Sequence, residues 1–261
     1  MSAKSETGAQ RAILISGAAS GIGLATARLF AGKGWLVGAL DRDETGLGRL
    51  SAELGNAVWT ATVDVTDRAE VLAVVAGFGE VAGRLDVLHN NAGIDAKGPF
   101  AEMDWAVIER LVAINLLGGM SLVHAAIPLL AQTERALCLT TCSASSIFGQ
   151  QNMAVYSATK FAVRGLTEAL SVELAPHGVR AADLIPGIID TGMLSEAEKA
   201  MLPNEGPLRV IPPSAVAEAA WAAWEGDRLH WFIPPELAAL DLAARQDAEA
   251  VRDRRIAGSP V

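Results

Sequence analysis

The sequence has little of what marks several classes of protein. It has only two cysteines among its 261 residues, Cys138 and Cys142, spaced four apart in an apolar run. Strand side chains at this spacing share a face but stand too far apart to bridge comfortably. We therefore expect two buried free thiols, which suit a reducing cytoplasm. Lysines and arginines do not cluster and the formal net charge is −9, which argues against nucleic acid or an anionic membrane as a partner.

Long apolar segments are also scarce. The first ten residues, MSAKSETGAQ, lack the apolar core of a signal peptide, and we expect no run to reach the ~18 apolar residues of a membrane span. These absences predict an unprocessed, soluble, cytoplasmic protein. The hydrophobic content of 51% is enough for one sizeable core in a chain of this length, so we expect a single domain over residues 1–261.

Short apolar runs alternate with helical periodicity along most of the chain. Such runs are typical of strands buried on both faces of a parallel sheet. The alternation predicts an α/β fold with a doubly wound, mainly parallel sheet and helices on both faces. The predicted strands are residues 11–16, 35–40, 57–63, 85–89, 135–141, 178–185 and 229–233, and predicted helices include 68–82, 105–130, 216–224 and a tail at 235–256.

A glycine-rich turn, GAASGIG at residues 17–23, joins the first predicted strand to a helical pattern. Glycines let the backbone approach a pyrophosphate, and the amides and dipole of the helix N-terminus favour the anion. The spacing is G-x-x-x-G-x-G rather than the G-x-G-x-x-G of many dinucleotide-binding folds. A plain tight turn is the alternative interpretation. The residues expected to bind a dinucleotide here are Ser16, Gly17, Ser20, Gly21, Ile22 and Gly23.

Asp41 ends the second predicted strand, eighteen residues beyond Gly23. This is close to the ~20 residues expected for the acid that accepts hydrogen bonds from the adenosine ribose. Its charge would repel a 2′-phosphate, so NAD is favoured over NADP, although the neighbouring Arg42 could soften the choice. Alternatively, Asp41 is a solvated residue at the start of the next helix, for which Asp43 is also a good N-cap.

Tyr156 and Lys160 are four apart in a run with helical periodicity, so their side chains share one helix face. A neighbouring ammonium stabilises a phenolate and lowers the tyrosine pKa from its usual ~10. Ser143, thirteen positions before Tyr156, follows an apolar run and would hold a substrate oxygen against the phenol. The alternative is a surface pair without a chemical role.

Ser143 and the Y-x-x-x-K motif together resemble the active-site segment of the short-chain dehydrogenase/reductase family, and the order of the other motifs over residues 12–191 agrees. The resemblance implies a Rossmann-type domain and reversible hydride transfer between NAD and a secondary alcohol or ketone. It implies that Tyr156 is the general acid/base, that Ser143 orients the substrate oxygen, and that Lys160 also binds the nicotinamide ribose.

Asn115 is the polar exception in the long apolar helix predicted at 105–130. A buried Asn needs hydrogen-bond partners. The resemblance implies that Asn115 holds a water in a proton relay to Lys160. The alternative is a structural Asn beside a helix irregularity, which Gly118 and Gly119 would support.

The resemblance also implies the remaining cofactor contacts. Two residues after the third strand would contact the adenine, the turn after the fourth would line the cofactor cleft, and a P-G-x-x-x-T segment would pack on the nicotinamide. Thr191 is expected to bind the carboxamide and also to cap the next helix. The asparagine-rich turn could equally be only a turn. These residues are Asp64 and Val65; Asn91, Ala92 and Gly93; and Pro186, Gly187, Ile189 and Thr191.

Residues 192–213 resemble the family's mobile substrate lid. Their apolar side chains suggest a small, uncharged, hydrophobic substrate, or else they tuck the lid onto the core. The family often has Gly where this chain has Ser146, three residues after the active-site Ser, so the turn could differ and Ser145 or Ser146 could compete for the substrate. The expected substrate contacts are Ser145, Phe148, Met153 and Met193.

We therefore expect an NAD-dependent alcohol dehydrogenase or ketone reductase that needs no metal. Residues 10–191 would form the cofactor-binding and catalytic core, and 214–261 a C-terminal helix, strand and tail. A homo-oligomer, dimer or tetramer, is expected because family members are often tetramers. Two alternatives are an NADPH-dependent ketoreductase, which Asp41 disfavours, and a non-catalytic NAD sensor, which the joint presence of the four active-site residues disfavours.

Overall fold

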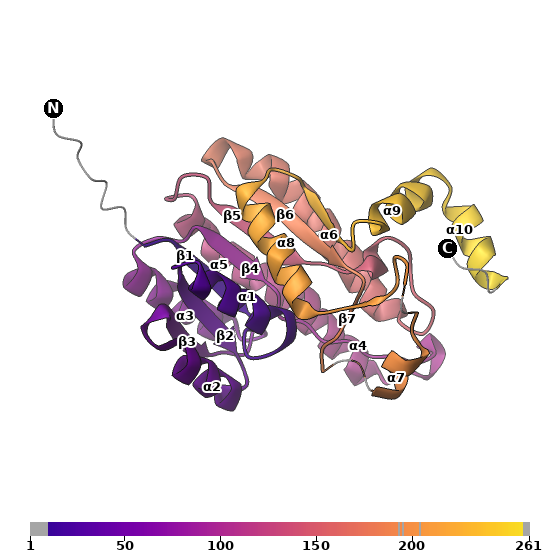
Figure 1. Cartoon of the computed structure of the whole chain (residues 1–261), viewed down its shortest axis with the longest axis horizontal. Helices are drawn as coiled ribbons and strands as arrows, with labels where there is room; N and C mark the ends of the chain where they lie inside the picture. Colours follow the sequence, from indigo (N-terminus) through magenta and orange to yellow (C-terminus); the bar gives the residue numbers. More distant parts are fainter. Residues whose placement is uncertain (1–9, 193, 195, 204, 258–261) are drawn as a thin grey trace.

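The computed structural model describes residues 10–257 except 193, 195 and 204. Its centre is a seven-stranded sheet in the order β3-β2-β1-β4-β5-β6-β9 (Figure 1), in which every pairing is parallel. The strands are β1 (Ala12–Ser16), β2 (Leu36–Asp41), β3 (Val58–Thr62), β4 (Val87–Asn90), β5 (Leu137–Thr141), β6 (Arg180–Pro186) and β9 (His230–Ile233). The predicted parallel α/β fold is confirmed, with each strand boundary within two residues.

Helices cover both faces of the sheet because side chains alternate along each buried strand. In β1, Ile13 and Ile15 join one apolar cluster while Ala12 and Leu14 join the other. Helices α1 (Gly21–Gly32), α2 (Glu44–Leu54) and α8 (Pro213–Glu225) lie on the first side. Helices α3 (Arg68–Ala82), α5 (Gly119–Leu130) and α6 (Ala154–Glu173) lie on the second, where α4 (Trp105–Val112) packs beside α6.

The strand order reverses between β1 and β4. The chain leaves these neighbouring strands toward opposite sides of the sheet, which opens a crevice at their carboxyl ends. Open α/β sheets bind ligands at such a point. The glycine turn follows β1 and the Asn-Asn-Ala-Gly turn follows β4, so both motifs lie at this crevice.

The long helix predicted at 105–130 is continuous but contains a π-helical turn, Ala113–Gly118, between α4 and α5. Its most apolar window has a mean hydropathy of 1.7, so by length and composition it could cross a membrane. The expectation that no segment would reach that length is therefore wrong. Leu111, Leu122, Ala126 and Leu130 on this helix are fully buried, which is the pattern of a core helix packed on a sheet.

The region predicted as a lid and the tail contain structure that the sequence did not predict. A two-stranded parallel pair, β7 (Ile188–Ile189) and β8 (Val210–Ile211), brackets most of residues 192–213, which carry α7 (Glu196–Met201). The predicted tail helix is two helices, α9 (Leu237–Gln246) and α10 (Ala248–Ile256), because Asp247 leaves the helical conformation and caps α10. Short 3₁₀ turns occupy Gly55–Ala57, Phe100–Glu102, Ala144–Ser146 and Ala175–His177.

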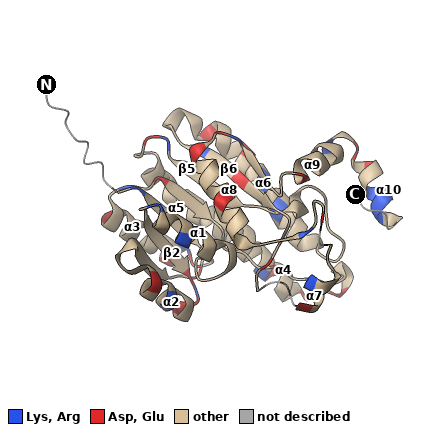
Figure 2. Cartoon of the chain, viewed as in Figure 1, with Lys and Arg blue, Asp and Glu red and all other residues tan. Residues whose placement is uncertain are grey.

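Both cysteines are buried and free, as predicted. Burial raises the pKa of Cys138 to about 12 and that of Cys142 to about 11, so both thiols stay protonated at neutral pH. In the view of Figure 2, residues of both charge signs are spread over the helices.

Asp86 links the amino ends of β1 and β4, at the opposite end of these strands from the crevice. Its buried carboxylate accepts hydrogen bonds from the Ala12 amide (2.9 Å) and from two nitrogens of Arg84 (2.8 and 2.6 Å). Removing it would leave a buried amide and a partly buried guanidinium without this partner. The pair therefore stabilises the strands that frame the crevice.

We expect Asp86→Ala to lower the free energy of unfolding by about 2–4 kcal/mol. At about 2–4 °C per kcal/mol for a chain of this size, thermal unfolding should occur on the order of 5–15 °C lower. Asp253→Ala is the matched control, because Asp253 pairs with Arg252 on the exposed side of α10 and such pairs contribute little. Equal melting temperatures for the two variants would contradict this role of Asp86.

Candidate active site

The structure brings Ser143 and Tyr156 together at the carboxyl edge of the sheet. Ser143 comes two residues after β5 and has extended backbone angles, and its hydroxyl accepts a hydrogen bond from the Ser145 amide (3.1 Å). Tyr156 lies in the first turn of α6, close enough to Ser143 for hydrogen bonding to the serine side chain to lower the pKa of its phenol. The end of β5 and the start of α6 thus bring the hydroxyls of Ser143 and Tyr156 close together.

Lys160 lies one turn along α6 and is almost fully buried. Its Nζ lies 5.6 Å from the centre of the Tyr156 ring and donates to the backbone oxygen of Thr141 (3.0 Å). Burial lowers the pKa of the Lys160 ammonium. The Tyr–Lys pair is therefore part of the buried site and not surface decoration.

The expected lowering of the tyrosine pKa by Lys160 is not found. Burial raises the pKa of Tyr156 to about 12, and the hydrogen bond with Ser143 opposes this rise. The lysine ammonium is directed at the Thr141 carbonyl instead of the phenol oxygen. The phenol is consequently protonated over the neutral range.

Asn115 lies in the π-helical turn, and both ends of its amide are used. Its Nδ2 donates to the backbone oxygen of Ile94 (2.8 Å) and its Oδ1 accepts from the Ile94 amide (2.9 Å). A Cβ added to Gly93 would lie 3.3 Å from Asn115 Oδ1 and 3.7 Å from Lys160 Nζ. The structural interpretation of Asn115 beside a helix irregularity is confirmed, and the water relay to Lys160 stays a prediction.

The glycine turn is so closely packed that its glycine positions have no room for a side chain. Gly17 and Gly21 have φ of +67° and +52°, and a Cβ on Gly23 would lie 2.0 Å from the Gly17 oxygen. Ser20, the N-cap of α1, makes no capping hydrogen bond through its side chain, and the first turn, which includes Ile22, carries no acidic residue. The N-terminus of α1 is therefore open to an anion.

Ser16 and Asn91 hold the two turns of the crevice together. The Ser16 hydroxyl accepts hydrogen bonds from the amides of Asn91 and Ala92 (3.0 Å each), and the Asn91 side chain donates to the Ser16 backbone oxygen (3.0 Å). The asparagine-rich turn is thus more than a surface turn, because its side chain and backbone position the glycine turn beside it.

Two further residues support this arrangement and were missed by the sequence analysis. The Thr141 hydroxyl donates to Asn91 Oδ1 (2.9 Å) and contacts His89 Nε2 (2.8 Å). Burial lowers the pKa of His89 to about 3, so its imidazole is neutral. The sequence did contain a signal for both residues. His89 and Thr141 are polar residues in apolar runs that were expected to be buried, and buried polar groups need hydrogen-bond partners.

Asp41 ends β2 beside the glycine turn. Its carboxylate accepts hydrogen bonds from the amides of Ala19 (2.9 Å) and Asp43 (3.0 Å). Asp43 caps α2 by accepting from the Gly46 amide (3.0 Å), so Asp41 is not the helix-capping residue. Arg42 is exposed.

The turn after β3 carries Asp64 and Val65, the two residues predicted to contact the adenine. Hydrogen bonds from the Thr66 amide and hydroxyl lower the pKa of Asp64, with nearby Arg42 and Arg110 adding to the effect. Val65 packs on the π-helical turn, where a Cβ on Gly118 would lie 2.8 Å from its methyl carbon. Glycine at 118 thus allows a close approach of helix and turn.

The predicted nicotinamide-facing segment follows β6. Pro186 ends β6, the Gly187 amide donates to the Ile233 oxygen (2.7 Å), and Ile189 lies in β7. A Cβ on Gly21 would lie 3.1 Å from the Thr191 methyl carbon, which places Thr191 against the glycine turn. The predicted capping role of Thr191 is wrong, because α7 begins only at Glu196.

The predicted substrate contacts have different surroundings. Ser145 is buried near Ser143, Met153 precedes α6 and is partly exposed, and Phe148 is buried against the C-terminal helices. Met193 lies outside the described residues. Ser146 satisfies its hydroxyl internally by donating to the Ser143 oxygen (2.7 Å) and accepting from Cys142, so it does not compete for a substrate.

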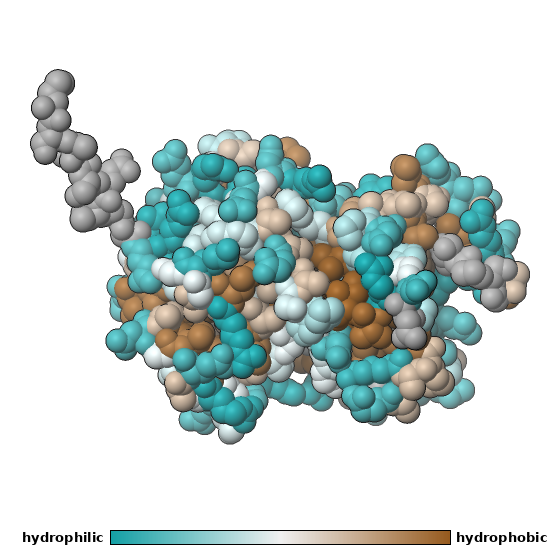
Figure 3. Space-filling view, in the orientation of Figure 1, coloured by the Kyte–Doolittle hydropathy of each residue, from teal (hydrophilic) through white to brown (hydrophobic). Residues whose placement is uncertain are grey.

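The site combines a proton-transfer pair with an anion-binding turn. The described residues contain no group of three or more His, Cys, Asp or Glu that could hold a metal ion. Figure 3 shows apolar surface gathered in a hollow near the position of β7 in Figure 1, on a face that is otherwise mostly hydrophilic. Such an arrangement can bind a dinucleotide and an organic substrate side by side.

The chain is similar to known proteins in sequence and in fold. The chain is 34% identical over 222 residues to cis-4-hydroxycyclohexanecarboxylate dehydrogenase of Sinomonas cyclohexanicum, covering 82% of this chain and 89% of that protein. A short-chain dehydrogenase/reductase from Burkholderia phymatum, solved with NAD, superposes with a TM-score of 0.81 at 27% identity, over 92% of this chain and 95% of the other.

The 3-ketoacyl-(acyl-carrier-protein) reductase of Brucella melitensis, solved with NADH, gives a TM-score of 0.78 at 29% identity, over 85% of this chain and 96% of the other. The family model for short chain dehydrogenases matches residues 11–202, a span that includes Asn115, Ser143, Tyr156 and Lys160. By fold, site and sequence, the protein belongs to the short-chain dehydrogenase family and is an oxidoreductase of that type.

Proposed function

We propose that this protein is an NAD-dependent oxidoreductase that interconverts a secondary alcohol and a ketone. The observation that carries the proposal is the placement of Ser143 and Tyr156 together at the strand edge, with buried Lys160 5.6 Å from the tyrosine ring. This pair stands at the crevice where the glycine turn opens toward an anion. Two solved relatives hold NAD or NADH, and one curated relative is named as the dehydrogenase of a ring alcohol.

The residues around the crevice fit a dinucleotide. The glycine turn leaves no room for side chains and presents an uncapped helix N-terminus, which suits a pyrophosphate. Asp41 stands at the end of β2, where its carboxylate would bind the adenosine ribose and repel a 2′-phosphate. Asp64 and Val65 would border the adenine. NAD, when bound, supplies the hydride acceptor or donor.

Tyr156 transfers the proton in the proposed reaction. With its pKa at about 12, the resting phenol is the protonated form that a ketone needs from a general acid. In the direction of alcohol oxidation the phenolate is needed, so that rate rises with pH until Tyr156 has ionised. A nearby positive charge lowers a phenol pKa, and Lys160 would do this only if its ammonium turned from the Thr141 oxygen toward the phenol. Ser143 orients the substrate oxygen.

The substrate in this proposal is small and mainly apolar. The hollow near β7 is apolar, and Ile189 and Ile211 are buried where the lid meets the core. The ring alcohol in the name of the Sinomonas relative supports a cyclic or branched secondary alcohol. Residues 192–213 would close over it as a lid.

We further propose a cytoplasmic homo-oligomer. Two buried free thiols suit a reducing compartment. Exposed apolar side chains on α5 and α6 form a face that a second copy would cover. They are Met120 on α5 and Phe161 and Val172 on α6, with Leu117 in the adjoining π-helical turn.

Tyr156→Phe tests the chemistry, because it keeps the ring and removes only the hydroxyl. We expect kcat over a panel of secondary alcohols with NAD to fall by about 10²–10⁴-fold, while the Kd for NAD changes by less than about twofold. Turnover that survives in the variant would contradict the proposal. NAD binding with no turnover by the wild-type protein, in either direction over alcohol and ketone panels, would favour a non-catalytic sensor.

Asp41→Ala tests the cofactor preference. Losing the carboxylate should raise the KM for NAD by about tenfold, the equivalent of one charge-assisted hydrogen bond, and should narrow the difference between NAD and NADP. Asp43→Ala is the matched control, since it removes a neighbouring carboxylate that caps α2. A wild-type protein that prefers NADPH, or an Asp41 variant with the same preference as the control, would contradict this assignment.

A further inference from the structure

The segment of residues 147–153 connects the two members of the catalytic pair. It begins after the 3₁₀ turn that follows Ser143 and ends at the start of α6, three residues before Tyr156. Its hydrogen bonds to the catalytic helix include one from the Gln150 amide to the Ser157 hydroxyl (3.0 Å). A shift of this segment therefore alters the wall of the substrate site next to both hydroxyls.

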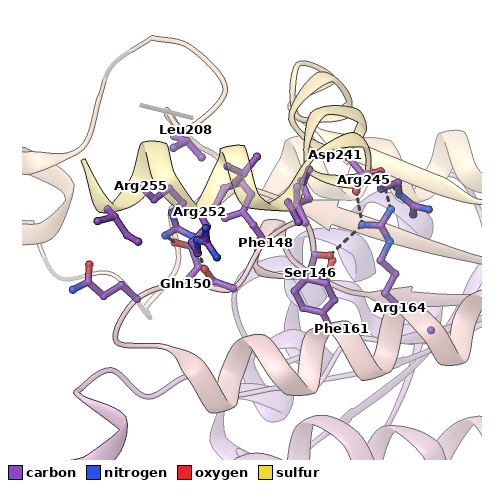
Figure 4. A pocket seen from close by; sticks show the side chains of 18 of the residues that line it. Ser146, Phe148, Gln150, Phe161, Arg164, Leu208, Asp241, Arg245, Arg252 and Arg255 are labelled. Carbon is purple, nitrogen blue, oxygen red and sulfur yellow. Dashed lines mark hydrogen bonds and ion pairs between the residues drawn. The ribbon is translucent and has the colours of Figure 1, made fainter. Parts of the chain in front are cut away.

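One guanidinium near the C-terminus holds three successive residues of this segment (Figure 4). Arg255 on α10 donates to the backbone oxygen of Gly149 and to the side-chain oxygen of Gln150 (2.8 Å). Its guanidinium carbon lies 4.6 Å from the centre of the Phe148 ring. More than a hundred residues separate the two partners in the sequence, so this contact is tertiary.

An apolar cluster lies behind this contact. Phe148 and Ile147 pack with Val251 of α10 and Leu237 of α9, and the cluster continues to Cys142 next to the catalytic serine. Val251 lies one turn before Arg255, so α10 presents an apolar residue and a cation to the same segment.

A buried ion pair anchors the other helix of the tail. Asp241 on α9 accepts two hydrogen bonds from Arg164 (2.6 and 2.9 Å), and Arg164 also donates to the Ser146 backbone oxygen (3.2 Å). Arg164 lies one turn after Lys160 on α6. The catalytic helix, the turn after Ser143 and the C-terminal tail therefore meet at one side chain.

We propose that α9 and α10 form a strap that holds residues 147–151, with Arg255 as the positioning residue that sets the shape of the substrate site. Beside the ion pair, α6 and the strap line a groove of about 1310 Å³. The strap contacts the segment through Arg255, Val251 and Leu237. The inference rests on the proposed dehydrogenase function for its kinetic consequence, but not for its structural one.

Arginine suits this role because its planar fork makes two directed hydrogen bonds and stacks on a ring at the same time. A lysine ammonium is a point charge that could reach one of the acceptors but not reproduce the fork and the stacking. Arg255→Lys should therefore be intermediate between the wild-type protein and Arg255→Ala. The matched control is Arg252→Ala, since Arg252 lies on the same helix and pairs with its neighbour Asp253.

The first measurement is hydrogen exchange of the peptide spanning residues 147–153 in the full chain. We expect Arg255→Ala to speed exchange of these amides by about tenfold or more, through local opening of the segment, and Arg252→Ala to leave it unchanged. Arg255→Lys should fall between them. Equal exchange protection of these amides in Arg255→Ala and Arg252→Ala would overturn the proposal that α9 and α10 hold the segment. This readout needs no turnover, so it decides the inference even if the proposed function fails.

The second measurement is steady-state kinetics with the best alcohol of the panel. We expect Arg255→Ala to raise the KM for the alcohol by about tenfold, with kcat and the KM for NAD within about twofold of the wild type, because loss of positioning weakens substrate binding. Arg255→Lys should recover part of this loss. An unchanged alcohol KM, or equal losses for the alcohol and for NAD, would overturn the specific role of Arg255.

Discussion

The site depends on a buried chain of hydrogen bonds that passes through Thr141. The Asn91 side chain donates to Ser16, the Thr141 hydroxyl donates to Asn91, and Lys160 donates to the Thr141 backbone oxygen. Four elements, β1, β4, β5 and α6, are joined in this way at the carboxyl edge of the sheet. Each buried bond is worth only about 1 kcal/mol net, but an unpaired polar group at this depth would cost more, so the arrangement is strongly specified.

This chain of bonds explains why two distant motifs operate as one site. The glycine turn follows β1 and the serine, tyrosine and lysine come from β5 and α6, so nothing local in the sequence brings them together. The strand order places β4 between β1 and β5, and the turn after β4 contacts both sides. Gly93 also lies against Asn115 and Lys160, which extends the same junction to the π-helical turn.

The local signals of the sequence predicted the strands, the main helices and the catalytic pair, because apolar runs, glycine turns and i, i+4 spacing are short-range patterns. They could not predict β7 and β8, since two-residue strands have no periodicity, nor the break at Asp247 in a tail that is helical on either side. His89 and Thr141 were overlooked because each lies in an apolar strand, and their hydrogen-bond partners come from a neighbouring strand or turn. The capping role expected of Thr191 failed because the following helix starts later than the pattern indicated.

The protonation of Tyr156 could not be predicted from spacing either. The i, i+4 pattern places Lys160 near the ring, but the depth of the site and the direction of the ammonium depend on the whole fold. Burial dominates and raises the pKa of Tyr156 to about 12. A charge brought into the crevice by a bound cofactor would act against that burial, so we expect the acid/base role to depend on the bound cofactor.

The most direct test of this account is a pH titration of the phenolate absorbance with and without NAD. Tyr156 is the single tyrosine of the chain, so the signal reports the catalytic residue alone, and the Tyr156→Phe variant supplies the blank. We predict a midpoint near pH 12 in the free protein and a lower midpoint in the NAD complex, because the positively charged nicotinamide stabilises the phenolate. A midpoint near the ordinary ~10 in the free protein, or one that NAD leaves unmoved, would contradict it.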